Sequence, residues 1–156
     1  MSKSLKRVRT ALETAGLITD IRETALSRTA QDAADALGCQ VDQIAKSIIL
    51  RGEISGEALL FITAGGQTVD LDAAAGLAGE PLGKADAALI RAQTGFAIGG
   101  VSPIGHVNET RKWFDRSLLA FDIVWAAAGT PHHVFALAPQ KMALLAQAEV
   151  ADFITA

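Results

Sequence analysis

Lys46 stands at the head of a strongly apolar segment, and this position leaves two roles open for its side chain. The residues that follow, Ser47-Ile48-Ile49-Leu50, are typical of a buried strand. A lysine there either extends its ammonium group to solvent along its aliphatic stem or directs it into a cleft. In a cleft, a compact ammonium group suits a phosphate or a developing oxyanion.

Residues 95–106 are the most unusual segment of the chain, because four glycines and one proline alternate there with apolar residues. Glycine allows a ligand to approach the backbone closely, so Gly99 and Gly100 favour a loop whose N–H groups face a developing oxyanion. A tight turn between strands requires the same residue types, and both interpretations remain open. His106 ends the segment, either as a catalyst or as a loop histidine bonded to a neighbouring carbonyl group.

Other common site types lack support in the sequence. There is no CxxC, HExxH or acidic calcium-loop pattern, so we expect neither a metal site nor a cofactor. His132 and His133 are adjacent and cannot both ligate one ion from a strand face. No P-loop and no GxSxG elbow occurs, and the glycines of residues 95–100 lack the strand-then-helix setting of a dinucleotide site. Lys46 and the glycine-rich loop remain as candidates.

Caps and periodicity predict the elements that must position these residues. We expect helices after the caps Ser4, Thr29, Asp70 or Asp72, and Asp86, and a last helix that begins at Pro139. Strands are expected over residues 46–51 and 57–64, which form a hairpin, and over 118–121, 123–127 and 134–137. A further short strand and connection are expected within residues 17–26. These elements predict one α+β domain.

The bulk composition favours a soluble globular domain. The chain has 156 residues, of which 50% are hydrophobic and 20% charged, with a net charge of −3 and a pI near 5.5. This charge argues against broad binding of long DNA or RNA, although basic residues at 3–9 could contact one RNA end or form a solvated helix face. With a single cysteine, no signal segment and no apolar stretch of about 20 residues, we expect a cytoplasmic protein without membrane contact.

Five segments, taken in chain order, resemble the YbaK family of aminoacyl-tRNA editing proteins, which is related to the insertion domain of bacterial prolyl-tRNA synthetase. These segments are residues 29–38, 43–47 (Gln-Ile-Ala-Lys-Ser), 65–70, 94–105 (with Gly-Gly-Val-Ser-Pro at 99–103) and 136–139. The resemblance runs from about Arg28 to Leu145. It implies that residues 1–156 form a single editing domain of α+β class, in which helices flank a curved mixed sheet that is nearly a barrel.

The resemblance also implies a site. Lys46 falls on the family's functional lysine, and Gly99 to Pro103 falls on its GxxxP loop. The expected catalytic residues are Lys46, Gly99 and Gly100, and the expected substrate-binding residues are Val101, Ser102, Pro103 and His106. No metal or cofactor is implied.

The implied activity is hydrolysis of the ester bond of misacylated tRNA, with a small amino acid attached to the wrong tRNA, such as tRNA-Pro. Loop N–H groups would hold the ester carbonyl, Lys46 would anchor the terminal phosphate or the carbonyl, and water would be the nucleophile. The expected partners are the acceptor end of misacylated tRNA and an aminoacyl-tRNA synthetase. Two alternatives remain: a non-catalytic module that docks on tRNA or a synthetase, and a small-molecule hydrolase or binder.

Overall fold

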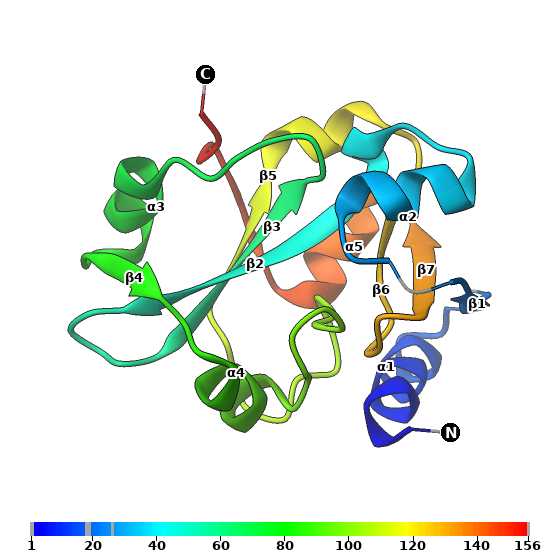
Figure 1. Cartoon of the computed structure of the whole chain (residues 1–156), viewed down its shortest axis with the longest axis horizontal. Helices are drawn as coiled ribbons and strands as arrows, with labels where there is room; N and C mark the ends of the chain where they lie inside the picture. Colours follow the sequence, from blue (N-terminus) through cyan, green and yellow to red (C-terminus); the bar gives the residue numbers. More distant parts are fainter. Residues whose placement is uncertain (1, 18–19, 26, 156) are drawn as a thin grey trace.

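The computed structural model describes residues 2–17, 20–25 and 27–155, which form a mixed α+β fold (Figure 1). In chain order the elements are α1 (Lys3–Thr14), β1 (Arg22–Glu23), α2 (Ala30–Leu37), the 3₁₀ turn η1 (Val41–Gln43), β2 (Ala45–Gly52), β3 (Ala58–Ala64), α3 (Leu71–Ala78), β4 (Leu82–Lys84), α4 (Ala87–Thr94), β5 (Lys112–Asp115), the 3₁₀ segment η2 (Arg116–Ala120), β6 (Val124–Ala127), β7 (His133–Leu137), α5 (Pro139–Ala146) and β8 (Glu149–Ala151).

The strands lie in two sheets, of which the larger is mixed in direction and the smaller is antiparallel. The larger sheet has the order β4-β2-β3-β5-β8 and the smaller one β1-β7-β6. The predicted β2–β3 hairpin is confirmed, with Ala45 opposite Ala64, whereas β3, β5 and β8 run parallel to one another. A bridge between Ile44 and Trp125 joins the two sheets. The expected fold class is confirmed, and within the described residues the strands do not close into a barrel.

One edge of β2 is uncovered over half of its length. β4 pairs with β2 only from Leu50 to Gly52, and the bridge at Ile44 lies beyond the other end. Among the described residues, no strand pairs with the outer edge of β2 from Ala45 to Ile49. In Figure 1, β6 and β7 stand beside this half of β2, with α2 close to them. The uncovered edge therefore faces the smaller sheet.

The helix caps are the residues that the sequence predicted, except at the first helix. Thr29, Asp70 and Asp86 accept hydrogen bonds from first-turn amides of α2, α3 and α4, as predicted. The predicted cap of the first helix was wrong: Ser2, in an extended conformation, accepts from the Leu5 amide, so α1 begins before Ser4. The Ser4 hydroxyl instead donates to the carbonyl oxygen of Gly95, 3.4 Å away.

The strand predicted over residues 118–121 is also wrong. That region is the 3₁₀ segment η2, and the strand lies just before it, at β5. Asp115 explains the boundary, because its carboxylate accepts hydrogen bonds from the Ser117 amide at 2.9 Å and the Ala64 amide at 3.0 Å. The first of these bonds turns the chain out of the strand. Around residues 17–26 only β1 forms, and residues 18, 19 and 26 lie outside the described residues.

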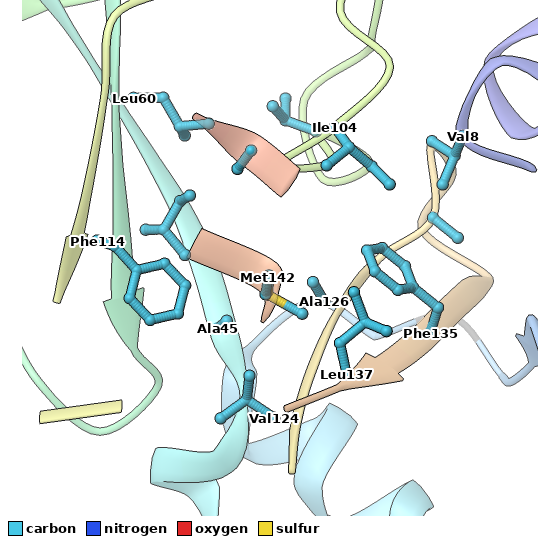
Figure 2. Close-up of a cluster of buried hydrophobic side chains, with 14 of the residues drawn as sticks. Val8, Ala45, Leu60, Ile104, Phe114, Val124, Ala126, Phe135, Leu137 and Met142 are labelled. Atoms are coloured by element: carbon cyan, nitrogen blue, oxygen red, sulfur yellow. The ribbon is translucent and has the colours of Figure 1, made fainter. Parts of the chain in front are cut away.

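The larger sheet is covered on both faces, as the apolar character of β2 and β3 predicted. On one face, buried side chains from both sheets, α1 and α5 converge in the cluster of Figure 2. On the other face, Phe61 stacks on Trp113 with ring centroids 4.8 Å apart, beneath apolar residues of α3. Ile104 belongs to the first cluster at 3% exposure. This burial anchors the glycine-rich loop in the core.

Candidate active site

A cleft of about 800 Å³ runs along the uncovered edge of β2 and reaches the smaller sheet. The consecutive residues 44–49 line it, together with the start of α2, part of the glycine-rich loop and the turn at residues 130–134. Much of its surface is apolar, with Ile49, Ile98 and Trp125 among the lining residues. Within the described part of the chain, the cleft contains the basic side chains Arg28, Lys46 and His133 and no carboxylate. The cleft therefore suits an apolar group attached to an anion.

The Lys46 side chain lies at the wall of this cleft. Its ammonium group donates hydrogen bonds to the carbonyl oxygens of Gly65, at 3.0 Å, and Gln67, at 2.6 Å. Partial burial lowers the pKa of Lys46, and the nearby Asp42 carboxylate partly opposes this shift. Two of the three N–H groups are thus engaged by backbone carbonyls, which fixes the position of the ammonium group. Of the two roles open to Lys46, the structure favours the cleft.

Ser47 connects the same strand to the glycine-rich loop. Its hydroxyl donates a hydrogen bond of 2.9 Å to the carbonyl oxygen of Val101. Consecutive side chains of a strand point to opposite faces, so Lys46 reaches the turn after β3 while Ser47 reaches the loop. Sequence reasoning assigned no role to Ser47, although it belongs to the segment 43–47 that resembles the YbaK family.

The two central glycines of the loop do different things. Gly99 has a φ of +89°, which favours glycine, and it lines the cleft. The N–H group of Gly100 donates to the carbonyl oxygen of Ala97 at 3.0 Å, so it is used inside the loop. A Cβ atom at Gly100 would lie 2.8 Å from Cα of Thr130. The loop can therefore approach the turn at residue 130 only because position 100 has no side chain.

The N–H groups of Gly99 and Val101 flank that of Gly100 in the loop. Neither has a hydrogen-bond acceptor among the described residues. Both residues line the cleft together with Lys46. Lys46 and two loop residues whose N–H groups have no acceptor in the described part of the chain thus line one cavity.

The remaining predicted site residues lie elsewhere. Ser102 is completely buried, and Pro103 and His106 line a separate hollow of about 560 Å³ that does not include Lys46. Nε2 of His106 lies 2.6 Å from the carbonyl oxygen of Ser102. A carbonyl oxygen accepts hydrogen bonds and cannot donate them, so this contact requires a proton on Nε2. His106 therefore holds the loop by its backbone.

The environment of His106 keeps its imidazole neutral at pH 7. Burial lowers its pKa to about 4, and the cations of Lys112 and Arg7 act in the same direction, against the Ser102 carbonyl. With Nε2 protonated, the neutral ring has an acceptor at Nδ1, which lies 3.2 Å from the Thr110 hydroxyl. A neutral donor in this place is suited to positioning the loop.

Arg7 binds both ends of the glycine-rich loop. Its guanidinium group donates to the carbonyl oxygen of Gly95 at 2.6 Å and to that of Gly105 at 3.1 Å, and it lies over the Phe96 ring at 5.0 Å. Sequence reasoning placed Arg7 in a basic helix face and missed this contact. No local pattern connects residue 7 with a loop about ninety positions later, so no signal in a single sequence points to it.

His133 also lines the cleft, a position that sequence reasoning left without a role. Its Nδ1 lies 2.7 Å from the Thr130 hydroxyl, and its Nε2 lies 3.9 Å from the Glu23 carboxylate. His132 is exposed, and its backbone N–H donates to the same Thr130 hydroxyl. The two adjacent histidines therefore stabilise the turn at residue 130, and one of them faces the cleft.

Across the described ranges, no group of three or more His, Cys, Asp or Glu side chains could hold a metal ion. Nor does any helix in those ranges have the length and apolar character needed to cross a membrane.

Comparison with known proteins gives a consistent result. Residues 24–144 match the family model described as aminoacyl-tRNA editing domain. YwhH, an uncharacterized protein of Bacillus subtilis (strain 168), is 31% identical over 140 residues, which cover 89% of this chain and 88% of YwhH. A solved structure described as a candidate trans-editing enzyme for prolyl-tRNA synthetase is 42% identical, with a TM-score of 0.91 over 100% of this chain and 99% of that one. The hypothetical protein APE2540 is 25% identical, with a TM-score of 0.87 over 96% and 99%.

Proposed function

Because this chain belongs to the family of aminoacyl-tRNA editing domains, we propose that it is a trans-editing hydrolase, which cleaves the ester bond of misacylated tRNA. The substrate would carry a small amino acid on the wrong tRNA, tRNA-Pro or one similar to it. The observation that carries the proposal is that Lys46, Gly99 and Val101 line one cleft. The similarity to a candidate trans-editing enzyme for prolyl-tRNA synthetase supports the choice of tRNA.

The cleft offers a place for each part of the substrate. The aminoacyl side chain would lie against the apolar surface around Ile49 and Trp125. The ester carbonyl oxygen would receive hydrogen bonds from the N–H groups of Gly99 and Val101 as it becomes an oxyanion. Lys46 would place its ammonium group against the terminal phosphate or the same oxygen. Gly100 would contribute by its lack of a side chain, because its own N–H group is bonded to Ala97.

The reaction needs no protein nucleophile. A water molecule, oriented by the neighbouring ribose hydroxyl, attacks the ester carbon, and the carbonyl electrons move to oxygen. Collapse of the tetrahedral intermediate breaks the bond to the ribose oxygen, which takes a proton that water supplied. The products are the free amino acid and uncharged tRNA. An aminoacyl ester is already an activated acyl group, so positioning and oxyanion stabilisation are adequate contributions from the protein.

A panel of tRNAs mischarged with radiolabelled amino acids tests the proposal. We expect the protein to release at least one small amino acid faster than buffer does. Lys46→Ala should lower kcat/KM by about 100-fold or more, the range that follows loss of one oxyanion-stabilising group. Lys84→Ala, at an exposed lysine of β4, is the matched control and should keep wild-type activity.

The same panel can reject the enzyme in favour of the non-catalytic alternative. If no mischarged tRNA loses its amino acid faster than in buffer, while tRNA or a synthetase still binds, the chain is a docking module. In either case we propose that the protein binds an aminoacyl-tRNA synthetase. We also propose that it is located in the cytoplasm, because aminoacyl-tRNA is made there.

A further inference from the structure

Helix α1 presents an exposed basic face. Leu5, Val8 and Leu12 are buried, whereas Lys3, Lys6 and Arg9 are exposed. There is no acidic residue in the first turn, and Ser2 caps the helix. The chain as a whole has 14 Lys and Arg against 17 Asp and Glu. Because the protein as a whole is acidic, this positive surface is a local feature that the overall charge does not explain.

The fold does not use these three cations. Arg7, on the buried side of the helix, makes the hydrogen bonds to Gly95 and Gly105. Among the described residues, the side chains of Lys3, Lys6 and Arg9 take part in no hydrogen bond or salt bridge. They remain available for a ligand, and their long side chains can adjust to it.

The helix is fixed beside the cleft. Arg7 binds both ends of the loop that provides Gly99, as described above. On the other side, a Cβ atom at Gly129 would lie 2.6 Å from the carbonyl oxygen of Ser4. Gly129 directly precedes Thr130 and Pro131, which line the cleft. Two loops that each contribute residues to the cleft are therefore packed against the first half of α1.

We propose that Lys3, Lys6 and Arg9 bind backbone phosphates of the RNA acceptor stem whose 3′ end enters the cleft. This inference rests on the proposed function, because it places the body of the substrate relative to its ester. Cations on an exposed helix face bind backbone phosphates and do not distinguish base sequences. The contact would therefore be the same for any acceptor stem. Discrimination between amino acids would stay in the cleft.

The test compares two charge-matched triple variants. The first is Lys3→Gln, Lys6→Gln, Arg9→Gln, and the control is Arg51→Gln, Lys84→Gln, Lys141→Gln, three exposed residues that do not line the cleft. Both lower the net charge by the same amount and both keep Arg7. Binding of an uncharged, fluorescent acceptor-stem hairpin RNA is measured by anisotropy at several salt concentrations, after circular dichroism has shown that both variants are folded.

We expect the α1 variant to bind the hairpin about tenfold or more weakly at low salt, with a log–log salt slope smaller by about 3, one unit for each lost phosphate contact. The control should stay within about twofold of wild type at about 0.15 M salt, where the Debye length is about 8 Å and distant charges are screened. Equal losses in both variants, or no loss in either, would overturn the inference. So would failure of the wild-type protein to bind the hairpin while it hydrolyses mischarged tRNA. Binding that depends on α1 without any ester hydrolysis would support this surface and reject the enzymatic proposal.

Discussion

The hydroxyl group of Ser47 donates a hydrogen bond of 2.9 Å to the carbonyl oxygen of Val101. This bond joins the strand that carries Lys46 to the loop that carries Gly99, so the two halves of the candidate site share one support. A rigid strand thereby sets the distance between an ammonium group and a row of backbone donors, which otherwise lie more than fifty residues apart in the chain.

Ser47→Ala should loosen the loop without unfolding the protein. The loss of one partly buried hydrogen bond should lower the free energy of unfolding by about 1 kcal/mol. We expect kcat/KM for a mischarged tRNA to fall about tenfold, because the donors of Gly99 and Val101 lose their fixed distance from Lys46. Amide hydrogen exchange of residues 97–104 should become faster. Unchanged exchange and activity in Ser47→Ala would show that the bond does not position the loop.

Gly100→Ala should damage the site by steric contact. The new Cβ atom would lie 2.8 Å from Cα of Thr130, so the loop and the turn must move apart. Crowding of this kind costs about 1–3 kcal/mol of stability, and we expect activity to be lost while circular dichroism still reports a folded protein. Gly76→Ala, inside α3 with nothing within 4 Å, is the control and should raise stability slightly. A fully active Gly100→Ala variant would contradict the close approach.

Protonation of His106 should destabilise the protein in acid. Its pKa is about 4 in the folded protein, below the ordinary value of 6.5. As the pH falls from 6.5 to 4, the unfolded state takes up the proton first, so stability is present above pH 6.5 and is lost toward pH 4. The loss can reach about 3 kcal/mol for this group.

His106→Gln and His106→Leu separate this effect from the titration of carboxylates. Gln can donate to the Ser102 carbonyl as Nε2 does but has no charge to gain, so its unfolding free energy should fall less between pH 6.5 and 4 than that of wild type. Leu lacks the donor, and at pH 7 it should lose both stability and activity. Urea denaturation at several pH values provides the measurement. Parallel curves for wild type and His106→Gln would rule out His106 as the titrating group.

The sequence predicted those features that depend on neighbouring residues. Thr29, Asp70 and Asp86 act as caps because a cap bonds to amides two or three positions ahead, which a local pattern contains. The β2–β3 hairpin follows from two apolar runs around a short turn. Local composition and the resemblance to the YbaK family also indicated Lys46 and Gly99 as site residues, and their roles stay predictions.

Features that depend on distant partners could not be predicted in this way. The role of Arg7 requires Gly95 and Gly105, and that of Gly100 requires Thr130, which no spacing rule connects. The short strands β4 and β8 have three residues each, too few for a period of two to appear. β5 begins and ends with charged residues, whereas the apolar run at residues 118–121 has the composition typical of a strand.

The bare edge of β2 has a consequence for solubility. Exposed strand edges attract strands of other molecules, and most proteins hide them beneath a further strand or a helix. In the described part of this fold no strand pairs with residues 45–49 at this edge, and these residues line the cleft instead. A lysine on such an edge is a common deterrent to unwanted pairing. Because Lys46→Ala removes this charge, the purified variant should aggregate sooner at high concentration.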